Sequence, residues 1–370
     1  MIKLASPDIR EEDIQEVIEV LRSRNLVQGA CVKKLEGQLS EYTNTPHCSL
    51  VSSGTAALHL SLMALGIGKG DAVIVSAFTF PATANVVEVI GAEVILCDVD
   101  PQSYVSAPEA LQQVIEQNKS KNIKAVILVH EFGYPAEIKQ ISEICKKHGL
   151  FLIEDAACAF GTIANGHHPG FYSDMACYSF HPRKAITTGE GGAVVSSKKK
   201  LMEKINCLKN HGITFTNGAM DFVAAGLNYR MTDFQAALAI GQLSRFDAEL
   251  AKRIKLAAVY YESLKEHNKI NLPKHHDNHS WQSFMITFHE ETNRTAVIEK
   301  LAEAGVQTNL GAQAINCLTY FKNKYGFNDN TAPHASYLYN KGLALPLYGK
   351  LNEADITFIC DKLIKISQND

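Results

Sequence analysis

Lys184 lies in a stretch whose composition could support covalent chemistry. The stretch Met175 to Val195 reads MACYSFHPRKAITTGEGGAVV, and it places the lysine between two apolar runs typical of buried strands. The glycines that follow, Gly189, Gly191 and Gly192, allow the backbone to approach a ligand closely. Partial desolvation in such a turn favours the neutral amine, which is the form that makes a Schiff base with a carbonyl. The stretch therefore predicts an aldehyde cofactor, with an ordinary surface lysine in a glycine-rich hairpin as the alternative.

A second candidate site lies where SLVSSGTAALHLSLMALG passes from a short apolar strand into a helix rich in alanine and leucine. Ser53, Gly54 and Thr55 stand at this junction. The first N–H groups of a helix and the positive end of its dipole attract an anion, and the serine and threonine hydroxyls add donors. We expect a phosphate to bind here, although Ser53 could cap the helix in either case.

Three further side chains are expected at the ends of strands. Asp155 follows the apolar residues of FLIEDA, where a carboxylate is costly unless it meets a cation. A protonated pyridine nitrogen is such a cation, and an aspartate partner keeps it protonated; capping of the next turn is the alternative. Phe80 ends DAVIVSAFTF and could stack on a flat ring or pack in the core. His130, in VILVHEFGYPAE, fits either the site or a hydrogen-bonded place at a loop entrance.

The elements between residues 71 and 156 alternate in type. Near-continuous apolar strands are separated by amphipathic helices, which predicts a parallel sheet covered on both faces. Ligands of such sheets bind at the carboxyl ends of the strands. The predicted helices lie over 81–91, 107–117 and 135–148, and a long helix is expected to run from just after Arg230 to about Lys265. Beyond a polar hinge, strands at 283–289 and near Val306 and a helix at 355–366 indicate a second, smaller α/β unit.

Composition restricts the class of protein. The 370 residues are 46% hydrophobic and 20% charged with a formal net charge of −3, so there is no general electrostatic attraction to nucleic acid or to an anionic membrane. No apolar run approaches the ~20 residues that cross a bilayer, and we expect a cytoplasmic protein. The nine cysteines include no C-x-x-C pair, which favours reduced thiols. His275 and His276 lack further ligand spacing, so no metal site is expected.

The segment SFHPRKAITTGEGGAVV resembles the cofactor-lysine segment of the DegT/DnrJ/EryC1/StrS aminotransferases, and the resemblance extends from EEDI at Glu11 to LPLYGKL at Leu345. It implies an α/β protein of the fold type I, aspartate-aminotransferase-like class of pyridoxal 5'-phosphate enzymes. The expected organisation is a large, mostly parallel sheet domain over residues 1–250, including an N-terminal helical segment, and a small α/β C-terminal domain over residues 251–370.

The resemblance also implies roles for individual residues. Lys184 would hold the cofactor aldehyde and move protons, and Asp155 would pair with the pyridine nitrogen. The remaining contacts to the cofactor would come from Ser53, Gly54, Thr55, Phe80, Cys158, Ser179 and Asn228, the last reaching the phosphate of a neighbouring subunit in a homodimer with shared sites. Cys158 departs from the glutamine or histidine common in the family, so the resemblance does not imply a hydrogen bond from this position to the cofactor or substrate. His181 and Arg183 are expected to shape the lysine turn or hold substrate.

The implied activity is transfer of an amino group from an amino acid, most often glutamate, to a keto-sugar carried on a nucleotide, in amino-sugar or polysaccharide biosynthesis. One branch of the family removes a sugar hydroxyl instead and has histidine in place of the lysine, so Lys184 argues against that branch. Two alternatives stay open. One is a lyase that uses the same cofactor and fold, and the other is a non-catalytic binding or regulatory protein.

Overall fold

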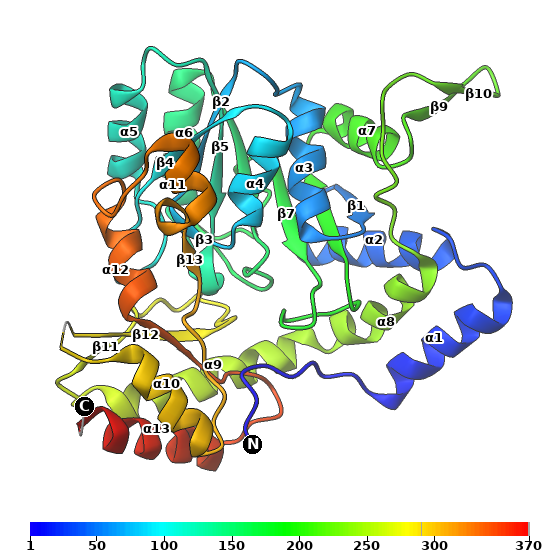
Figure 1. Cartoon of the computed structure of the whole chain (residues 1–370). Helices are drawn as coiled ribbons and strands as arrows, with labels where there is room; N and C mark the ends of the chain where they lie inside the picture. Colours follow the sequence, from blue (N-terminus) through cyan, green and yellow to red (C-terminus); the bar gives the residue numbers. More distant parts are fainter. Residues whose placement is uncertain (290, 369–370) are drawn as a thin grey trace.

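A seven-stranded sheet forms the centre of the molecule (Figure 1). The computed structural model describes residues 1–289 and 291–368. The strand order is β1-β8-β7-β6-β5-β2-β4, and β8 alone among these seven runs antiparallel to its neighbours. The predicted α/β class and mostly parallel sheet are confirmed. The strands are β1 (His47–Val51), β2 (Ala72–Ser76), β4 (Glu93–Cys97), β5 (Ile123–Val129), β6 (Phe151–Asp155), β7 (Met175–Ser179) and β8 (Gly192–Ser196).

Helices cover both faces of this sheet because alternate strand residues point to opposite sides. Val73 and Ile153 pack in one core with α3 and α4, whereas Ile74 and Leu152 pack in another with α5 and α6. A third core joins the β1–β8–β7 edge to α2 and α8. The helices are α2 (Ala30–Thr43), α3 (Gly54–Leu65), α4 (Ala82–Val89), α5 (Pro108–Gln117), α6 (Ile138–His148), α7 (Lys199–Leu208) and α8 (Asp233–Ser244).

A smaller three-stranded sheet lies below the large one in Figure 1. Its strands are β11 (Ile270–Asn271), β12 (Phe284–Phe288) and β14 (Gly342–Leu345), and α9 (Phe246–Leu264), α10 (Arg294–Glu303) and α13 (Glu353–Gln368) pack around them. The expected strand near Val306 is wrong, because Val306 makes only a single bridge to Ile2. The third strand is β14, which pairs with β12 across 54 residues of chain.

Two features differ from the expected division of the chain. The predicted boundary after Leu250 falls inside α9, and the predicted long helix is two helices, α8 and α9, which meet at Arg245. Residues 312–338 also return to the core of the large sheet. They comprise β13 (Gln313–Ala314), which pairs with β3 (Phe78–Thr79), followed by η2 (Ile315–Cys317), α11 (Thr319–Tyr325) and most of α12 (Pro333–Lys341).

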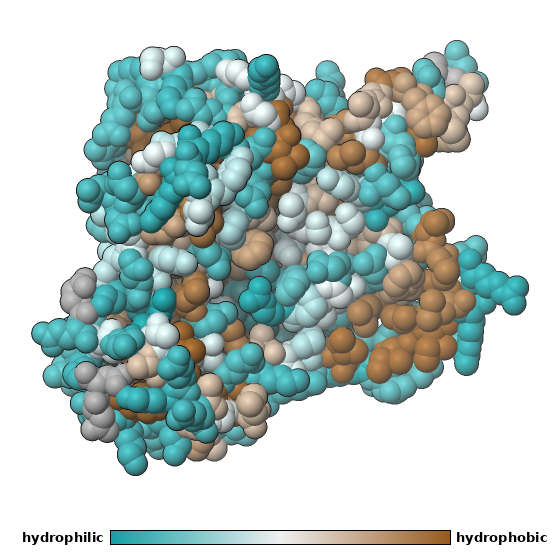
Figure 2. Space-filling view, viewed as in Figure 1, coloured by the Kyte–Doolittle hydropathy of each residue, from teal (hydrophilic) through white to brown (hydrophobic). Residues whose placement is uncertain are grey.

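Apolar side chains remain uncovered on one side of the molecule. The hairpin of β9 (Ile213–Thr216) and β10 (Ala219–Phe222) projects from the body, and α1 (Glu11–Ser23) lies along its edge (Figure 1). Helix α1 leaves apolar side chains exposed, since Ile14 is 42% and Leu21 is 50% exposed. Figure 2 shows hydrophobic side chains gathered in both places. No helix in the described part of the chain is long and apolar enough to cross a membrane.

Candidate active site

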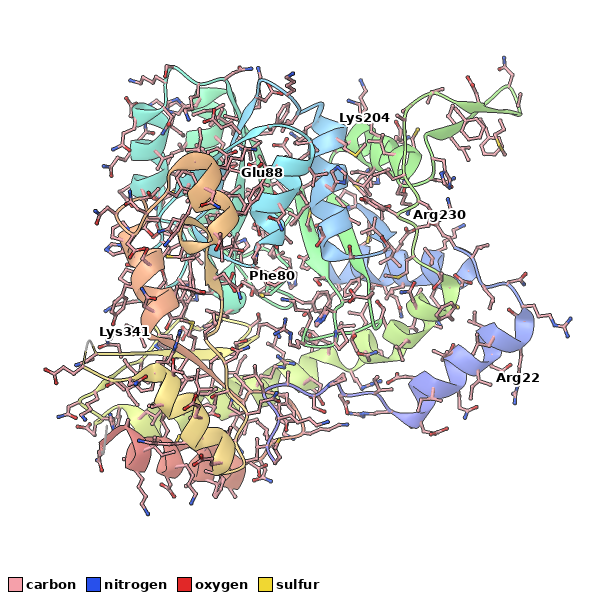
Figure 3. All side chains as sticks on the ribbon, viewed as in Figure 1. Arg22, Phe80, Glu88, Lys204, Arg230 and Lys341 are labelled. Carbon is pink, nitrogen blue, oxygen red and sulfur yellow. The ribbon has the colours of Figure 1, made fainter. Side chains whose placement is uncertain are left out.

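A cavity of about 420 Å³ lies between the two sheets, at the carboxyl ends of the parallel strands. Phe80 marks its place in Figure 3. Most of the residues singled out from the sequence line this cavity, although they come from segments up to 131 positions apart. The structure brings together Ser53, Gly54, Thr55, Phe80, Asp155, Cys158, Ser179, His181, Arg183 and Lys184. From the small-sheet side the lining includes Gln282 and Asn309, and Gln313 lines the cavity from β13, which pairs with β3.

The turn that carries Lys184 is fixed by hydrogen bonds at both of its ends. The Lys184 N–H donates to the His181 carbonyl at 2.8 Å, and the Thr187 hydroxyl donates to the Phe180 carbonyl at 2.9 Å. The Gln242 side chain, on α8, binds the Thr187 backbone twice, accepting from its N–H at 3.0 Å and donating to its carbonyl at 2.9 Å. The turn therefore holds the lysine in one place, with Nζ 2.9 Å from Cys158 Sγ.

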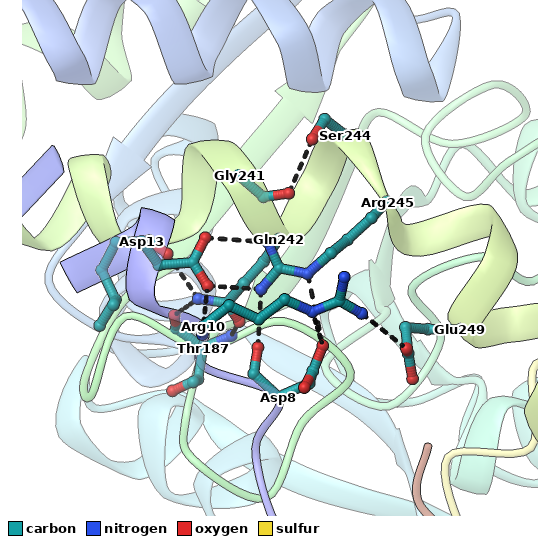
Figure 4. A network of polar contacts seen from close by, with 10 residues as sticks. Asp8, Arg10, Asp13, Thr187, Gly241, Gln242, Ser244, Arg245 and Glu249 are labelled. Atoms are coloured by element: carbon teal, nitrogen blue, oxygen red, sulfur yellow. Dashed lines mark hydrogen bonds and ion pairs between the residues drawn. The ribbon is translucent and has the colours of Figure 1, made fainter. Parts of the chain in front are cut away.

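A buried ion-pair network anchors the end of α8 from which Gln242 projects (Figure 4). Arg245 donates to Asp13 at 2.9 Å and to the Asp8 carbonyl at 2.8 Å, while the Arg10 N–H also donates to Asp13 at 2.9 Å. Burial opposes ionisation of Asp13, but the hydrogen bonds from Arg245 and Arg10 outweigh it and lower the pKa of that carboxyl. The first helix is thus tied to the junction of α8 and α9, which in turn supports the lysine turn.

The charge on Lys184 differs from the expectation of a neutral amine. Burial opposes the ammonium form, but the acidic groups that face it from Cys158, Glu131 and Asp155 outweigh burial and raise the pKa of Lys184 above its ordinary value. The prediction of a lowered pKa was wrong because the sequence pattern gave no sign that two carboxyl groups converge on the same turn. In the protein alone, this lysine is an ammonium ion.

Asp155 is 5% exposed at the end of β6 and lines the cavity. Thr83 donates its hydroxyl to one carboxylate oxygen at 2.7 Å, and the Ala157 N–H donates to the other at 3.1 Å. Burial raises the pKa of Asp155, and these two hydrogen bonds together with Lys184 partly offset the rise. The bond from Ala157 is the turn-capping contact considered as an alternative, yet the carboxylate also faces the cavity. It is therefore available to a cationic ring nitrogen.

Phe80 presents its ring to the cavity rather than to the core, because its side chain is 59% exposed. The strand expected to end at Phe80 ends earlier, since β2 stops at Ser76 and Phe78–Thr79 form the short β3. Phe80 follows β3 directly, beside the cap of α4. This position suits stacking on a flat ring and excludes ordinary core packing.

The expected phosphate seat is formed by α3 and its neighbours. The Ser53 hydroxyl accepts the Ala56 N–H at 3.0 Å, so the predicted cap is present. Ser179 lies beside the same helix end, because a Cβ added at Gly54 would be only 2.9 Å from the Ser179 Cβ. A Cβ at Gly192 would likewise lie 2.6 Å from the Ser53 carbonyl carbon. Both glycines allow the lysine hairpin and the start of α3 to approach each other, which leaves the helix N–H groups open toward the cavity.

Gly192→Ala is expected to weaken cofactor binding by at least tenfold, or about 1.4 kcal/mol. The added methyl group would push the Ser53 backbone away from the phosphate seat. Titration of the cofactor against the purified variant, followed by absorbance, measures the effect. Gly37→Ala is the matched control, because a Cβ there meets nothing within 4 Å. An affinity of Gly192→Ala equal to that of Gly37→Ala would contradict the packing argument.

Two of the predicted residues lie away from the cavity. His130 is fully buried, with Nε2 2.7 Å from Glu154 and Nδ1 accepting the Ala136 N–H at 3.1 Å. Both ring nitrogens are engaged within the fold, so the structure gives His130 a structural place instead of the expected role in substrate binding. Asn228 is exposed and pairs through its backbone with Asn210, outside the cavity of its own chain.

His181 and Arg183 lie at the rim of the cavity and also shape the lysine turn. His181 Nδ1 accepts the Arg183 N–H at 3.2 Å, and burial lowers the pKa of this imidazole. The Arg183 carbonyl accepts the side-chain amide of Gln282 at 2.5 Å, which joins the turn to the small-sheet side. Within the described residues no group of three or more acidic, cysteine or histidine side chains could hold a metal ion.

Sequence reasoning missed Thr83 and Gln242, and it left Glu131 without a role. Thr83 and Gln242 sit inside amphipathic helices, where a single polar residue gives no signal that it supports a site. Glu131 is 5% exposed and lines the cavity beside Cys158 and Lys184. An acidic residue two positions after the apolar run of β5 was the available signal, and it resembles the signal that identified Asp155.

Comparison with known proteins identifies the family of the chain. A model of the DegT/DnrJ/EryC1/StrS aminotransferase family matches residues 7–364. An uncharacterized protein, MJ1066 of Methanocaldococcus jannaschii, is 31% identical and is aligned over 97% of this chain and 96% of its own length. Spr1654 of Streptococcus pneumoniae, provisionally assigned as a sugar aminotransferase, superimposes in its PLP form with a TM-score of 0.91 at 28% identity, covering 100% of this chain and 99% of Spr1654. PseC of Helicobacter pylori, an aminotransferase involved in the biosynthesis of pseudoaminic acid, superimposes with a TM-score of 0.93 at 25% identity over the full length of both chains.

The fold, the lysine turn and the buried aspartate define a pyridoxal-phosphate-dependent aminotransferase of fold type I. The chain belongs to the DegT/DnrJ/EryC1/StrS family, whose members include sugar aminotransferases. Its cofactor is pyridoxal 5'-phosphate, and the cavity has groups suited to each part of that molecule: an amine, a buried carboxylate, an aromatic face and a helix N-terminus.

Proposed function

We propose that the protein transfers an amino group from glutamate to a keto-sugar linked to a nucleotide, for amino-sugar or polysaccharide biosynthesis. The observation that supports this most strongly is the convergence of Lys184 and Asp155 on one cavity that also opens onto the N-terminus of α3. A lysine alone would suit many reactions, and a buried carboxylate alone would suit a structural ion pair. Together with an anion seat they match the three functional parts of pyridoxal phosphate.

Bound pyridoxal phosphate supplies an electron sink and carries the amino group between the two substrates. Asp155 keeps a proton on the ring nitrogen, and Phe80 covers one face of the ring. Ser53, Gly54, Thr55 and Ser179 bind the phosphate. Lys184 Nζ would hold the cofactor aldehyde at rest and, once released, would accept and return the proton of the α-carbon of the amino donor. The same lysine reverses this transfer with the sugar.

The sugar is proposed to bind on the small-sheet side of the cavity. Gln282 and Asn309 line this side and Gln313 lies beside it on β13, and their amide groups can donate to and accept from sugar hydroxyls. Arg183 and His181, at the rim, suit the anionic nucleotide. This half of the cavity is built from loops that the sequence pattern did not describe, in agreement with substrate choice being set there.

The test is a single-turnover reaction of the holoenzyme with glutamate. We expect the visible absorbance of the lysine-bound cofactor to be replaced by that of pyridoxamine phosphate, with one 2-oxoglutarate formed per site. Aspartate and alanine serve as competing donors, and a panel of nucleotide-linked keto-sugars then identifies the acceptor. Release of a cleaved amino acid product in place of 2-oxoglutarate would contradict amino transfer and support the lyase alternative.

We also propose that the protein is a homodimer in which Asn228 contributes to the partner's phosphate seat. Asn228 is exposed outside its own cavity. The apolar side chains left uncovered nearby, Val27 at 71%, Phe215 at 67% and Phe222 at 63% exposure, belong to the region after α1 and to the projecting hairpin (Figure 2). Exposed apolar groups gathered in this way are typical of a surface that is covered in the assembled protein.

A mixing experiment tests the shared site. Lys184→Ala and Asn228→Ala are each expected to be impaired as pure dimers, but a mixed dimer contains one site with both native residues. Mixing the two variants after mild dissociation should therefore restore activity. An activity of the mixture no higher than the summed activities of the two separate variants would contradict a shared active site. Sedimentation of the protein as a monomer would contradict the homodimer.

A further inference from the structure

Glu131 is a second buried acid in the active-site cavity, and the position of its backbone directs the side chain into that cavity. It opens η1 (Glu131–Gly133), which His130 alone separates from the end of β5. The next residue, Phe132, has a φ of 54°, in the left-handed region that non-glycine residues rarely adopt, and its carbonyl accepts the Gln282 N–H at 2.9 Å. The Thr162 hydroxyl donates to the Gly133 carbonyl at 2.7 Å. A backbone strained in this way and held on both sides leaves the Glu131 side chain little freedom.

Cys158 lies between this acid and the lysine. Its sulfur is 2.9 Å from Lys184 Nζ and 4.0 Å from Glu131 Oε1, the outer limit for a hydrogen bond to sulfur. A thiol can accept a hydrogen bond from an ammonium group and donate one to a carboxylate. The order amine, thiol, carboxylate is therefore a continuous path. The structure thus places the Glu131 carboxyl and the Cys158 thiol facing each other in the cavity.

Two threonine hydroxyls connect Glu131 to Asp155 on the other side. Thr79 is hydrogen-bonded to Glu131 and lies 3.1 Å from the Thr83 hydroxyl, which donates to Asp155 at 2.7 Å. Each hydroxyl has one proton to give. Thr83 gives its proton to Asp155. The Thr79 hydroxyl can turn its single proton toward Thr83 or toward Glu131, and in the second case it lowers the pKa of the Glu131 carboxyl. The Thr79 hydroxyl can therefore meet Glu131 in either protonation state, as a group that takes up and releases a proton requires.

We propose that Glu131 and Lys184 exchange a proton through Cys158 during amino transfer. The ammonium of Lys184 gives a proton to Sγ while the thiol proton passes to the Glu131 carboxylate, leaving a neutral amine, an unchanged thiol and a carboxylic acid. The reverse step returns the proton. Glu131 and Cys158 are positioning residues, because they determine at which stage the Lys184 amine is neutral and can accept a proton. This inference rests on the proposed function.

The charges around Glu131 are consistent with this role. Lys184, Asp155 and Cys158 are the titratable groups that face it, while its chain neighbour His130 is turned away and paired with Glu154. Burial raises the pKa of Glu131 to about 7, and Asp155 adds to the rise while Lys184 opposes it. A carboxyl group with this pKa can both take up and release a proton near neutral pH.

Kinetics of the glutamate half-reaction test the relay. Glu131→Gln keeps the size of the side chain but cannot take up the proton, and we expect a rate about 10²-fold lower near neutral pH, the lower end of what positioned proton transfer contributes. Cys158→Ala should lower the rate of the half-reaction by about the same factor. The double variant with Glu131→Gln and Cys158→Ala should be no slower than either single variant. Cys158→Ser should retain most of the rate, because a hydroxyl also passes a proton. Additive losses, or equal losses for Cys158→Ser and Cys158→Ala, would overturn the relay.

Alkylation of Cys158 in the holoenzyme tests the same contact without any substrate. Burial raises the pKa of the Cys158 thiol, Lys184 opposes the rise, and the Glu131 carboxylate adds to it. Glu131→Gln should therefore be alkylated faster than wild type above neutral pH, by about tenfold for a thiol pKa lower by one. An unchanged alkylation profile would overturn the inference even if glutamate reacts. A shifted profile in a protein that does not react with glutamate would support the Glu131–Cys158 contact and refute the proposed function instead.

Discussion

Lys184→Ala is expected to reduce amino transfer from glutamate by at least about 10⁴-fold, the upper end of what one positioned proton-transfer group contributes. The variant loses both the covalent hold on the cofactor and the base that moves the α-proton. The turn is stabilised by hydrogen bonds of Thr187 and Gln242 that do not involve Lys184 Nζ. The variant should therefore keep the native fold. Stopped-flow absorbance of the glutamate half-reaction measures the loss.

The matched control for this variant is Lys200→Ala, an exposed lysine on α7 outside the cavity, which should react at the wild-type rate. A small primary amine such as methylamine should restore part of the activity of Lys184→Ala, because it can stand in for the missing base. A Lys184→Ala protein that turns over glutamate at a rate within tenfold of wild type would rule out this lysine as the base.

Asp155→Asn should slow the same half-reaction by about 10²- to 10³-fold, the range seen when one preorganised electrostatic partner is removed. An amide oxygen can still accept from Thr83 and Ala157, but it carries no charge to keep a proton on the ring nitrogen. Lys184 still binds the cofactor in this variant, so the visible absorbance should remain while its response to glutamate becomes slow. Lys184→Ala and Asp155→Asn therefore distinguish covalent attachment of the cofactor from protonation of its ring nitrogen.

Asp174→Asn is the control for loss of a buried carboxylate near the same strand. Asp174 accepts the Leu152 N–H at 2.7 Å near the opposite end of β6 and pairs with Lys198. We expect this variant to have a lower melting temperature and an unchanged half-reaction rate. Equal rate losses in Asp155→Asn and Asp174→Asn would mean that Asp155 acts through stability alone.

The central sheet, Lys184 and Asp155 could be predicted because each depends on a local pattern. Continuous apolar runs identify strands buried on both faces, and a charged residue directly after such a run must lie at the carboxyl edge, where ligands bind. The junction of β1 and α3, where we expect the phosphate to bind, was predictable for the same reason, since only two residues separate the end of β1 from the start of α3.

The remaining features depend on partners distant in sequence, which no local pattern describes. His130 reads like Asp155 from the sequence, and only Glu154 and Ala136 show that it is turned inward. The ammonium state of Lys184 depends on Glu131 and Cys158 acting together. The return of residues 312–338 to the large sheet could not be foreseen, because the two residues of β13 are too few to give a strand pattern.

The reversed direction of β8 has a consequence for how the enzyme acquires its cofactor during folding. Because β8 runs against its neighbours, Gly192 at its start pairs with Val51 at the end of β1 and with Ser179 at the end of β7. The phosphate seat and the lysine turn are therefore joined only when β1 has docked on a strand that follows it by 141 positions. Closing a loop of that length is an entropic cost met late in folding. Pyridoxal phosphate should consequently bind the native chain and not its partly folded precursors, and the free energy of its binding adds directly to the resistance of the sheet edge to unfolding.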